Sequence, residues 1–209
     1  MNASPDNAAE PRIVLFAPAD RLAALQGGLE GLAAIVVTDG AEALEDGVRA
    51  NLRAAGIPVL KKVSVAERAQ GFDGLHVAGN AGELKAARKA LPAGAMLGAG
   101  DARTRHAAMQ LGEAMPDYVL LGRIATADPT DGDIAADADL VSWWAELFEL
   151  PAVAVAGELA DVADLAGAGA DFVAVNRLVW SSDDPAATLV AVAGAIAASP
   201  ARQPAEQDA

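Results

Sequence analysis

Short apolar runs alternate with longer amphipathic stretches along nearly the whole chain, and this alternation strongly limits the folds open to it. Short apolar runs are typical of strands buried on both faces of a parallel sheet, and the stretches between them have helical periodicity. We expect eight strands, over residues 13–16, 34–37, 58–60, 74–77, 95–97, 118–121, 152–155 and 172–175. We expect helices near residues 21–28, 41–55, 65–70, 81–90, 101–115, 140–148, 159–166 and 185–198.

Three phrases along the chain repeat one another: QGFDGLHV at residues 70–77, MPDYVLL at 115–121 and AGADFVAV at 168–175. Each gives a turn, an aspartate and then a buried strand, as expected when one βα unit is reused around a barrel. The 209 residues fall at the small end of the range for such a barrel. We therefore predict an α/β fold, a single-domain (β/α)8 TIM barrel. A doubly wound open sheet is the alternative, because periodicity cannot show closure.

The barrel is expected to span residues 13–198. The flanking residues 1–12 and 199–209, rich in Ala, Pro and polar side chains, are expected to be disordered tails. The start of the chain lacks the basic and apolar regions of a secretory signal. No apolar run approaches the roughly 18 residues that indicate a membrane span. We therefore expect a cytoplasmic protein.

Charge and composition exclude several classes of function. Fifteen Lys and Arg stand against 29 Asp and Glu, a formal net charge of −14, which disfavours nucleic acids and anionic membranes as partners. Without cysteine there is no disulfide, thiolate zinc site or thiol nucleophile. With only two histidines, the chain has few side chains for a histidine-based dyad or metal site. We expect His76 to be packed within a strand and His106 to lie outside on a helix.

Local signals mark some helix ends and surfaces. Asp101 is a plausible N-cap, and Asp184 precedes Pro185 at a first helical position. An aromatic helical face predicts core packing or a subunit contact, which leaves a homo-oligomer open; its residues are Leu140, Trp143, Trp144, Leu147 and Phe148. An acidic run misses the spacing of a calcium loop and is interpreted as a solvated loop; it comprises Asp128, Asp131, Asp133, Asp137 and Asp139.

The strand phrases resemble those of the thiamine phosphate synthase superfamily, which also contains thiazole tautomerases. The resemblance covers roughly residues 12–198 and is most specific at 74–77, 117–122, 143–157 and 168–176. It implies a TIM barrel, a role in thiamine biosynthesis and a transferase reaction. In that reaction a hydroxymethylpyrimidine diphosphate is joined to a thiazole phosphate with Mg²⁺, and pyrophosphate is released.

The residues that the resemblance implies for this reaction are mostly replaced. After the second strand, a Gln-x-Arg-x-Lys phrase is usual, but residues 36–40 read VVTDG. Lys61 and Lys62 stand where an Asn-Asp pair would supply a magnesium ligand, and an ammonium group cannot ligate Mg²⁺. The resemblance implies a second magnesium-ligating aspartate after the fourth strand, and residues 76–81 contain none. Gly100 replaces a serine, and no lysine occurs between residues 123 and 139.

Candidate site residues are taken from the carboxyl ends of the predicted strands, where TIM barrels carry their sites. The cations there form a basic mouth for a phosphate or carboxylate, or are paired with nearby acids. Gly157 and the amides of residues 176 and 177 are able to hold a phosphate, although a glycine after a strand is also ordinary turn chemistry. The candidates for ligand or phosphate binding are Lys61, Lys62, Arg123, Gly157, Asn176 and Arg177.

The leading hypothesis is a divergent family member without Mg²⁺- and pyrophosphate-dependent synthase activity that binds a small anionic, phosphorylated ligand. No cofactor is expected, and Mg²⁺ only if synthase activity is retained. One alternative is an active synthase with a rearranged site, in which Asp39 or Asp101 holds the metal. Others are a metal-free, tautomerase-like isomerase and a non-catalytic barrel that binds a partner. The sequence alone identifies no catalytic residue.

Overall fold

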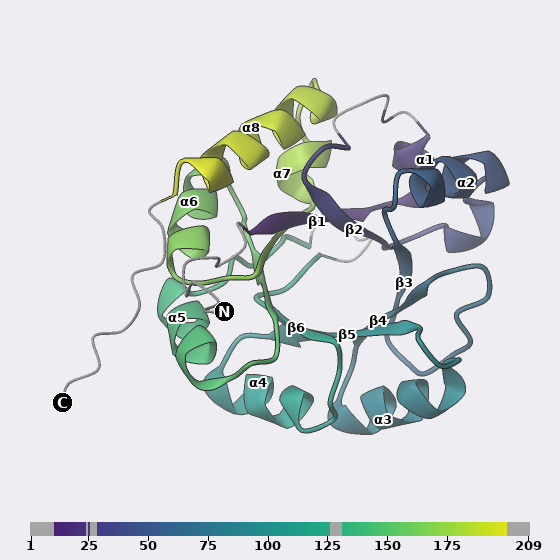
Figure 1. Cartoon of the computed structure of the whole chain (residues 1–209), viewed down its shortest axis with the longest axis horizontal. Coiled ribbons are helices and arrows are strands. Elements are labelled where there is room, and N and C mark those ends of the chain that lie inside the picture. Colours follow the sequence, from purple (N-terminus) through teal and green to yellow (C-terminus); the bar gives the residue numbers. More distant parts are fainter. Residues whose placement is uncertain (1–10, 24, 26–28, 126–130, 200–209) are drawn as a thin grey trace, which may run out of the picture.

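The computed structural model describes residues 11–23, 25, 29–125 and 131–199. Eight parallel strands follow one another around a closed barrel, and β1 pairs with β8 (Figure 1). This closure confirms the TIM barrel and rules out the open sheet. The strands are β1 (Arg12–Ala17), β2 (Leu32–Val37), β3 (Val59–Val63), β4 (Gly74–Ala78), β5 (Met96–Ala102), β6 (Tyr118–Leu121), β7 (Ala152–Val155) and β8 (Phe172–Val175).

Helices surround the barrel in Figure 1. They are α1 (Ala19–Leu22), the 3-10 helix η1 (Ala41–Ala43), α2 (Asp46–Ala54), α3 (Ala81–Ala90), α4 (Arg105–Gly112), α5 (Ala138–Leu147), α6 (Leu159–Gly167), α7 (Arg177–Trp180) and α8 (Pro185–Ala197). Within the described ranges, none has both the length and the apolar character needed to cross a membrane. Part of the helix expected at residues 21–28 lies outside the described residues.

The helix expected near residues 65–70 is wrong, because β3 and β4 are joined by a loop. Six residues are too few for a helix that packing does not support. Two longer-range contacts hold the loop instead. The Ala66 amide donates to Glu83 Oε2 at 2.9 Å, and Glu67 pairs with Lys61 at 2.7 Å.

Apolar side chains fill the inside of the barrel, so it is a packed core and not a pore. Inside it, the His76 ring packs against the rings of Phe16 and Tyr118. Two glycines of β5 make room for them. A Cβ on Gly98 would come within 2.1 Å of the Tyr118 ring, and one on Gly100 within 2.6 Å of His76 Nε2. The glycine at position 100 is therefore required by packing against His76.

The three repeated phrases share one structural role at the amino-terminal end of the barrel. In each, the aspartate accepts a hydrogen bond from the amide of the first or second residue of the preceding strand. Asp73 accepts from Val59 at 2.9 Å, Asp117 from Leu97 at 2.6 Å, and Asp171 from Ala152 at 2.8 Å; we name these three aspartates the base aspartates. They satisfy strand-end donors that would otherwise be orphaned.

Two of the local predictions at helix ends and surfaces need correction. Asp184 does cap α8, since its side chain accepts from the Ala187 amide. Asp101 lies inside β5, and Thr104 is the N-cap of α4. On α5, Trp144 is buried and stacks on Phe148, but the Leu147 side chain is 62% exposed and does not share the packed face. Helical periodicity therefore identified only part of this surface.

Candidate active site

Strand β3 extends past the predicted boundary and carries both lysines on opposite faces. Lys61 lies on the outer face, where its Nζ pairs with Glu67 at 2.7 Å. It lines a cavity of about 460 Å³ together with Arg49 and Phe72, beside the loop that replaces the expected helix. Lys62 follows Leu60, an interior residue, on the inward face of the strand. Alternation along β3 thus separates the two lysines.

Lys62 is held at the carboxyl end of the barrel, which we name the mouth. Its Nζ donates to the carbonyl oxygen of Ile124 at 2.9 Å. Burial lowers the pKa of Lys62, while the charges of Asp101, Asp39 and Asp133 oppose that shift. Desolvation of a cation is the largest of these effects, so Lys62 loses its proton more readily than a surface lysine.

Asp101 lies where β5 carries one extra residue relative to β6. Between Ala99 and Ala102 the register with β6 shifts, and Asp101 falls inside this irregularity. Burial raises the pKa of Asp101, whereas the Lys62 charge and a hydrogen bond from the Ile124 backbone lower it. Its Oδ1 is buried without a hydrogen-bond partner in the described part of the chain. Asp101 also lines a cavity of about 540 Å³ between α3 and α4.

The pKa of Lys62 is lowered and that of Asp101 is raised, so the two values are shifted toward each other, while among the described residues no ion pair or hydrogen bond joins the two side chains. Both interact with the same residue, Ile124, one through its carbonyl and the other through its amide. Shifted titratable pairs at the end of barrel strands are candidates for chemistry, since proton transfer between them costs less than between ordinary side chains.

Asp133 is a second, half-buried acidic centre of the mouth. Its Oδ1 accepts from the Ala125 amide at 2.8 Å and from Asn176 Nδ2 at 3.0 Å, and its Oδ2 accepts from the Arg177 amide at 2.9 Å. An antiparallel bridge between Arg123 and Ile134 brings its loop over the mouth. The solvated-loop interpretation is therefore wrong for Asp133. Asp128 of the same run lies outside the described residues.

Arg123 is engaged by the same loop. Its two terminal nitrogens contact the two carboxylate oxygens of Asp131 at 2.7 and 2.6 Å, a bidentate ion pair. The hydrogen bond to Asp131 raises the pKa of Arg123, so the guanidinium stays charged. The solvated-loop interpretation is therefore also wrong for Asp131.

Two carboxylates of the chain contact amides that were expected to bind a phosphate. Asp161 Oδ2 accepts from the amides of Gly157 and Glu158 at 2.8 and 3.0 Å. Asp133 accepts from the backbone amide of Arg177 and from the side-chain nitrogen of Asn176. The structure thus gathers Lys62, Arg123, Asn176 and Arg177 around one end of the barrel. Lys61 lies on the outer face of β3 and Gly157 before α6.

His76 lies beneath this site and is fully buried. Its Nδ1 is 2.9 Å from the Tyr118 hydroxyl, and Nε2 has no hydrogen-bond partner among the described residues. Burial, together with the Lys62 charge, lowers the pKa of His76 to about 3. His76 is accordingly the packed strand residue that the sequence predicted, and the structure adds that it is neutral above about pH 3. His106 is exposed on α4, also as predicted.

Sequence reasoning missed the roles of Asp101 and Asp133. The apolar run that marks β5 ends before Asp101, so the position resembled a helix start. Asp133 and Asn176 are 43 residues apart in the sequence, and no local pattern links them. Only the repeated strand phrases, which place both β6 and β8 in one barrel, indicate that their following loops can meet.

Comparison with known proteins agrees with the fold and with the family resemblance of the strand phrases. A family model described as thiamine monophosphate synthase matches residues 40–179. The thiamine-phosphate synthase of Hyphomonas neptunium is 33% identical over 171 residues, covering 81% of this chain and 77% of the relative. That of Erythrobacter litoralis is 41% identical over 119 residues, and the match spans only 55% of either protein.

Solved structures show the same barrel. Thiamine phosphate pyrophosphorylase from Pyrococcus furiosus matches with a TM-score of 0.67 at 18% identity, over 90% of this chain and 96% of that one. A 3-hexulose-6-phosphate synthase from Salmonella typhimurium matches with a TM-score of 0.65 at 16% identity, over 89% and 98%. At these identities the structures establish the fold alone. With the family match over residues 40–179 and the Hyphomonas relative, the chain belongs to the thiamine monophosphate synthase family.

Proposed function

We propose that this chain is a divergent member of its family that lacks Mg²⁺- and pyrophosphate-dependent synthase activity and binds a small ligand with one anionic group in the barrel mouth. The observation that carries the proposal is the position of Lys62. Its ammonium group is half-buried at the end of β3 and bonded to the Ile124 carbonyl. The resemblance to the family implies a magnesium ligand at this place.

The residues of the mouth do not fit Mg²⁺. The ion needs oxygen ligands in near-ideal octahedral geometry, whereas Lys62 presents only donors and a like charge. The described residues contain no group of three or more His, Asp or Glu side chains able to hold a metal. Asp133 already accepts three hydrogen bonds, and Asp131 is engaged by Arg123. This supports the loss of a metal-dependent step.

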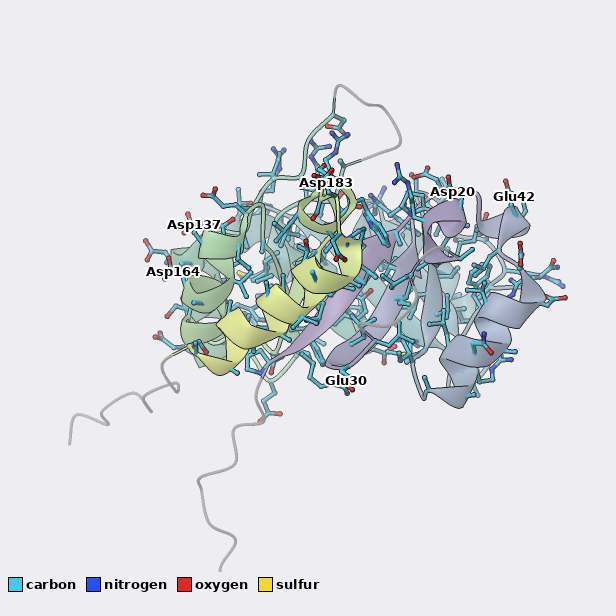
Figure 2. The ribbon with its side chains drawn as sticks, turned by 90° about the horizontal axis from the view of Figure 1, so that it is seen from above. Asp20, Glu30, Glu42, Asp137, Asp164 and Asp183 are labelled. Atoms are coloured by element: carbon cyan, nitrogen blue, oxygen red, sulfur yellow. The ribbon has the colours of Figure 1, made fainter. Side chains whose placement is uncertain are left out.

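The charge distribution also disfavours pyrophosphate. The amides before α6 and at α7 donate to Asp161 and Asp133, so a polyanion would compete with carboxylates of the protein itself. Figure 2 shows Asp20, Glu42 and Asp183 projecting along one edge of the molecule. These exposed residues follow β1, β2 and β8, so acidic side chains line the mouth end. A ligand with one negative charge meets less repulsion than pyrophosphate.

Isothermal titration tests this proposal with Mg²⁺ alone, pyrophosphate alone and both together. We expect no mutual dependence, because no group is present to bridge the two. The Lys62→Met variant is titrated in parallel, with Lys61→Met as the matched control on the outer face of β3. Tight binding of Mg²⁺ and pyrophosphate, each strengthened by the other, would overturn the proposal.

The second candidate is an active synthase with a rearranged site, which the names of the relatives favour. Asp39, Asp101 and Asp133 all act on Lys62 electrostatically, so carboxylates do gather in the mouth. This candidate requires formation of thiamine phosphate from the two family substrates with Mg²⁺. Turnover that is lost in Asp101→Asn but kept in Lys61→Met would establish it. Cytoplasmic location and a homo-oligomer stay predictions.

A further inference from the structure

We propose that the cavity between α3 and α4 is a binding site for a small aliphatic amine in its protonated, ammonium form. This goes beyond the proposed function, which concerns an anionic ligand at Lys62. Three observations carry the proposal: the walls of the cavity, the charge of its lining and a buried oxygen atom that has no hydrogen-bond partner in the described part of the chain.

The cavity has an inner wall of strand ends and an outer wall of helices. Its volume is about 540 Å³, within the range of small-molecule sites. Ala78 and Gly100 line it on the barrel side, near the ends of β4 and β5. Helices α3 and α4, which lie next to each other in Figure 1, contribute Ala81, Ala107 and Leu111. These apolar side chains favour an alkyl chain as part of the ligand.

The charges of the lining are negative. Asp101 and Glu113 contribute carboxylates, and no Lys, Arg or His is among the described residues that line the cavity. Glu113 directly follows α4, where the helix carbonyls already make the potential negative, and the last turn of α4 holds no basic residue. A bound cation would offset the repulsion between Glu113 and this helix end. The lining therefore favours a positively charged ligand.

The N-terminus of α3 also meets the cavity, and a free helix N-terminus would favour an anion. Here the Asn80 side chain caps the helix. Its Oδ1 accepts from the Gly82 amide at 2.8 Å and from the Glu83 amide at 3.2 Å. Because these amides of the first turn are engaged within the chain, the carboxylates of the lining decide its preference.

The Asp101 carboxylate supplies an acceptor for the ammonium group. Its Oδ1 is buried, and no described residue donates a hydrogen bond to it. Lys62, whose charge acts on Asp101, donates to the Ile124 carbonyl instead. A buried oxygen without a donor is costly unless a ligand or water uses it. An ammonium group brings both N–H donors and a positive charge to this oxygen.

A divalent metal ion fits the cavity less well than an ammonium group. Such ions need about six oxygen ligands. In the part of the chain that the structure describes, no three His, Asp or Glu side chains gather to hold a metal. Asp101 and Glu113 alone leave that ligand set incomplete. An ammonium group on a short alkyl chain, by contrast, uses both the carboxylates and the apolar walls.

Titration of the isotope-labelled full chain with n-butylammonium chloride tests the proposal, read from backbone amide chemical shifts by NMR. We expect shifts at residues 78–82 and 107–113, with a dissociation constant on the order of 1 mM. Binding of n-butanol, which has the same chain but no charge, should be at least about tenfold weaker. Equal concentrations of NaCl control for ionic strength. Absence of shifts around the cavity, or equal binding of butanol, would overturn the proposal.

Three variants test which carboxylate holds the amine. Asp101→Asn keeps the shape of the side chain and removes its charge, so the affinity for butylammonium should fall about tenfold. Glu113→Gln should lower it about twofold, because this carboxylate is exposed. Glu149→Gln removes an exposed carboxylate outside the lining, so this matched control should bind as the unaltered chain does. Unchanged affinity in a folded Asp101→Asn variant would overturn the proposal.

The Ala107→Leu variant tests the cavity without removing a charge. The larger side chain should fill part of the volume and abolish butylammonium binding, which keeps the test decisive if Asp101→Asn does not fold. Unchanged binding in Ala107→Leu would place the amine elsewhere and overturn the proposal. These titrations use neither Mg²⁺ nor pyrophosphate, so their failure is distinguishable from failure of the proposed function.

Discussion

The two ends of the barrel are built differently. At the amino-terminal end, the base aspartates repeat one contact three times, each carboxylate accepting from an amide at the start of the preceding strand. At the mouth no contact repeats. Asp133 collects amides from two loops, Arg123 pairs within its own loop, and Lys62 bonds to the backbone beyond β6.

The repeated contacts belong to the scaffold of the barrel, and the single contacts belong to the candidate site. A contact repeated with the βα unit serves closure of the barrel, since every unit needs its strand ends satisfied. A contact that occurs once, between loops far apart in sequence, serves a local arrangement of charge. TIM barrels keep stability at the base and function at the mouth. The following predictions test that division, in order of decreasing effect.

Acid should lower the stability of the barrel through His76, which is buried between its two ends. The pKa of His76 is about 3 in the folded chain and about 6.5 when unfolded, so between these values the unfolded chain binds an extra proton. The stability that neutral His76 contributes is fully present above the unfolded pKa. It is lost as the pH falls through this window. We expect His76 to account for about 3 kcal/mol of unfolding free energy lost between pH 6.5 and pH 4.

Urea unfolding at pH 6.5, 5 and 4 measures this loss. The His76→Gln variant serves as the comparison, because the glutamine amide does not titrate. Its unfolding free energy should therefore change less with pH. If the unfolding free energy depended on pH equally in both proteins, His76 would not stay neutral in the folded chain.

Asp133→Ala should be the most damaging single change at the mouth. It removes the acceptor for the Ala125 amide, the Asn176 amide group and the Arg177 amide. We expect a loss of about 2 kcal/mol in unfolding free energy, because these donors lie in half-buried positions. Asp139→Ala, an exposed residue of the same acidic run, should change stability by less than about 0.5 kcal/mol. Equal effects would place Asp133 in a solvated loop after all.

Asp171→Ala should cost less, about 1 kcal/mol, because it leaves one donor, the Ala152 amide, without its carboxylate. Asp171→Asn keeps an acceptor oxygen and should recover most of the loss. Asp164→Ala is the matched control, since Asp164 projects from the outside of α6 (Figure 2). Equal losses in Asp171→Ala and Asp164→Ala would contradict a role for this base aspartate in satisfying the strand end.

Lys61→Met should have the smallest effect, about 0.3 kcal/mol, since its ion pair with Glu67 is partly exposed and solvent-screened. The pair should weaken further at high salt. Chemical denaturation at low and high salt measures this. A loss above about 1 kcal/mol would show that the β3–β4 loop depends on this contact more than its exposure indicates.

The sequence predicted most of the fold and little of the site. The boundaries of β6, β7 and β8 agree with the apolar runs, because a strand buried on both faces must be apolar along its length. The ends of β3 and β5 were set too early, since both strands continue into polar residues. Those residues are Lys61 and Lys62 in one strand and Asp101 in the other.

By itself, the sequence determined the order of eight strands, the packed histidine and the repeated aspartates before three of the strands. All of these follow from periodicity and near-neighbour contacts, which the order of residues encodes directly. Only the tertiary structure decided which lysine faces the mouth and which acids meet it. The direction of a side chain at a strand end depends on register, and the partners of Asp133 come from loops joined by closure of the barrel.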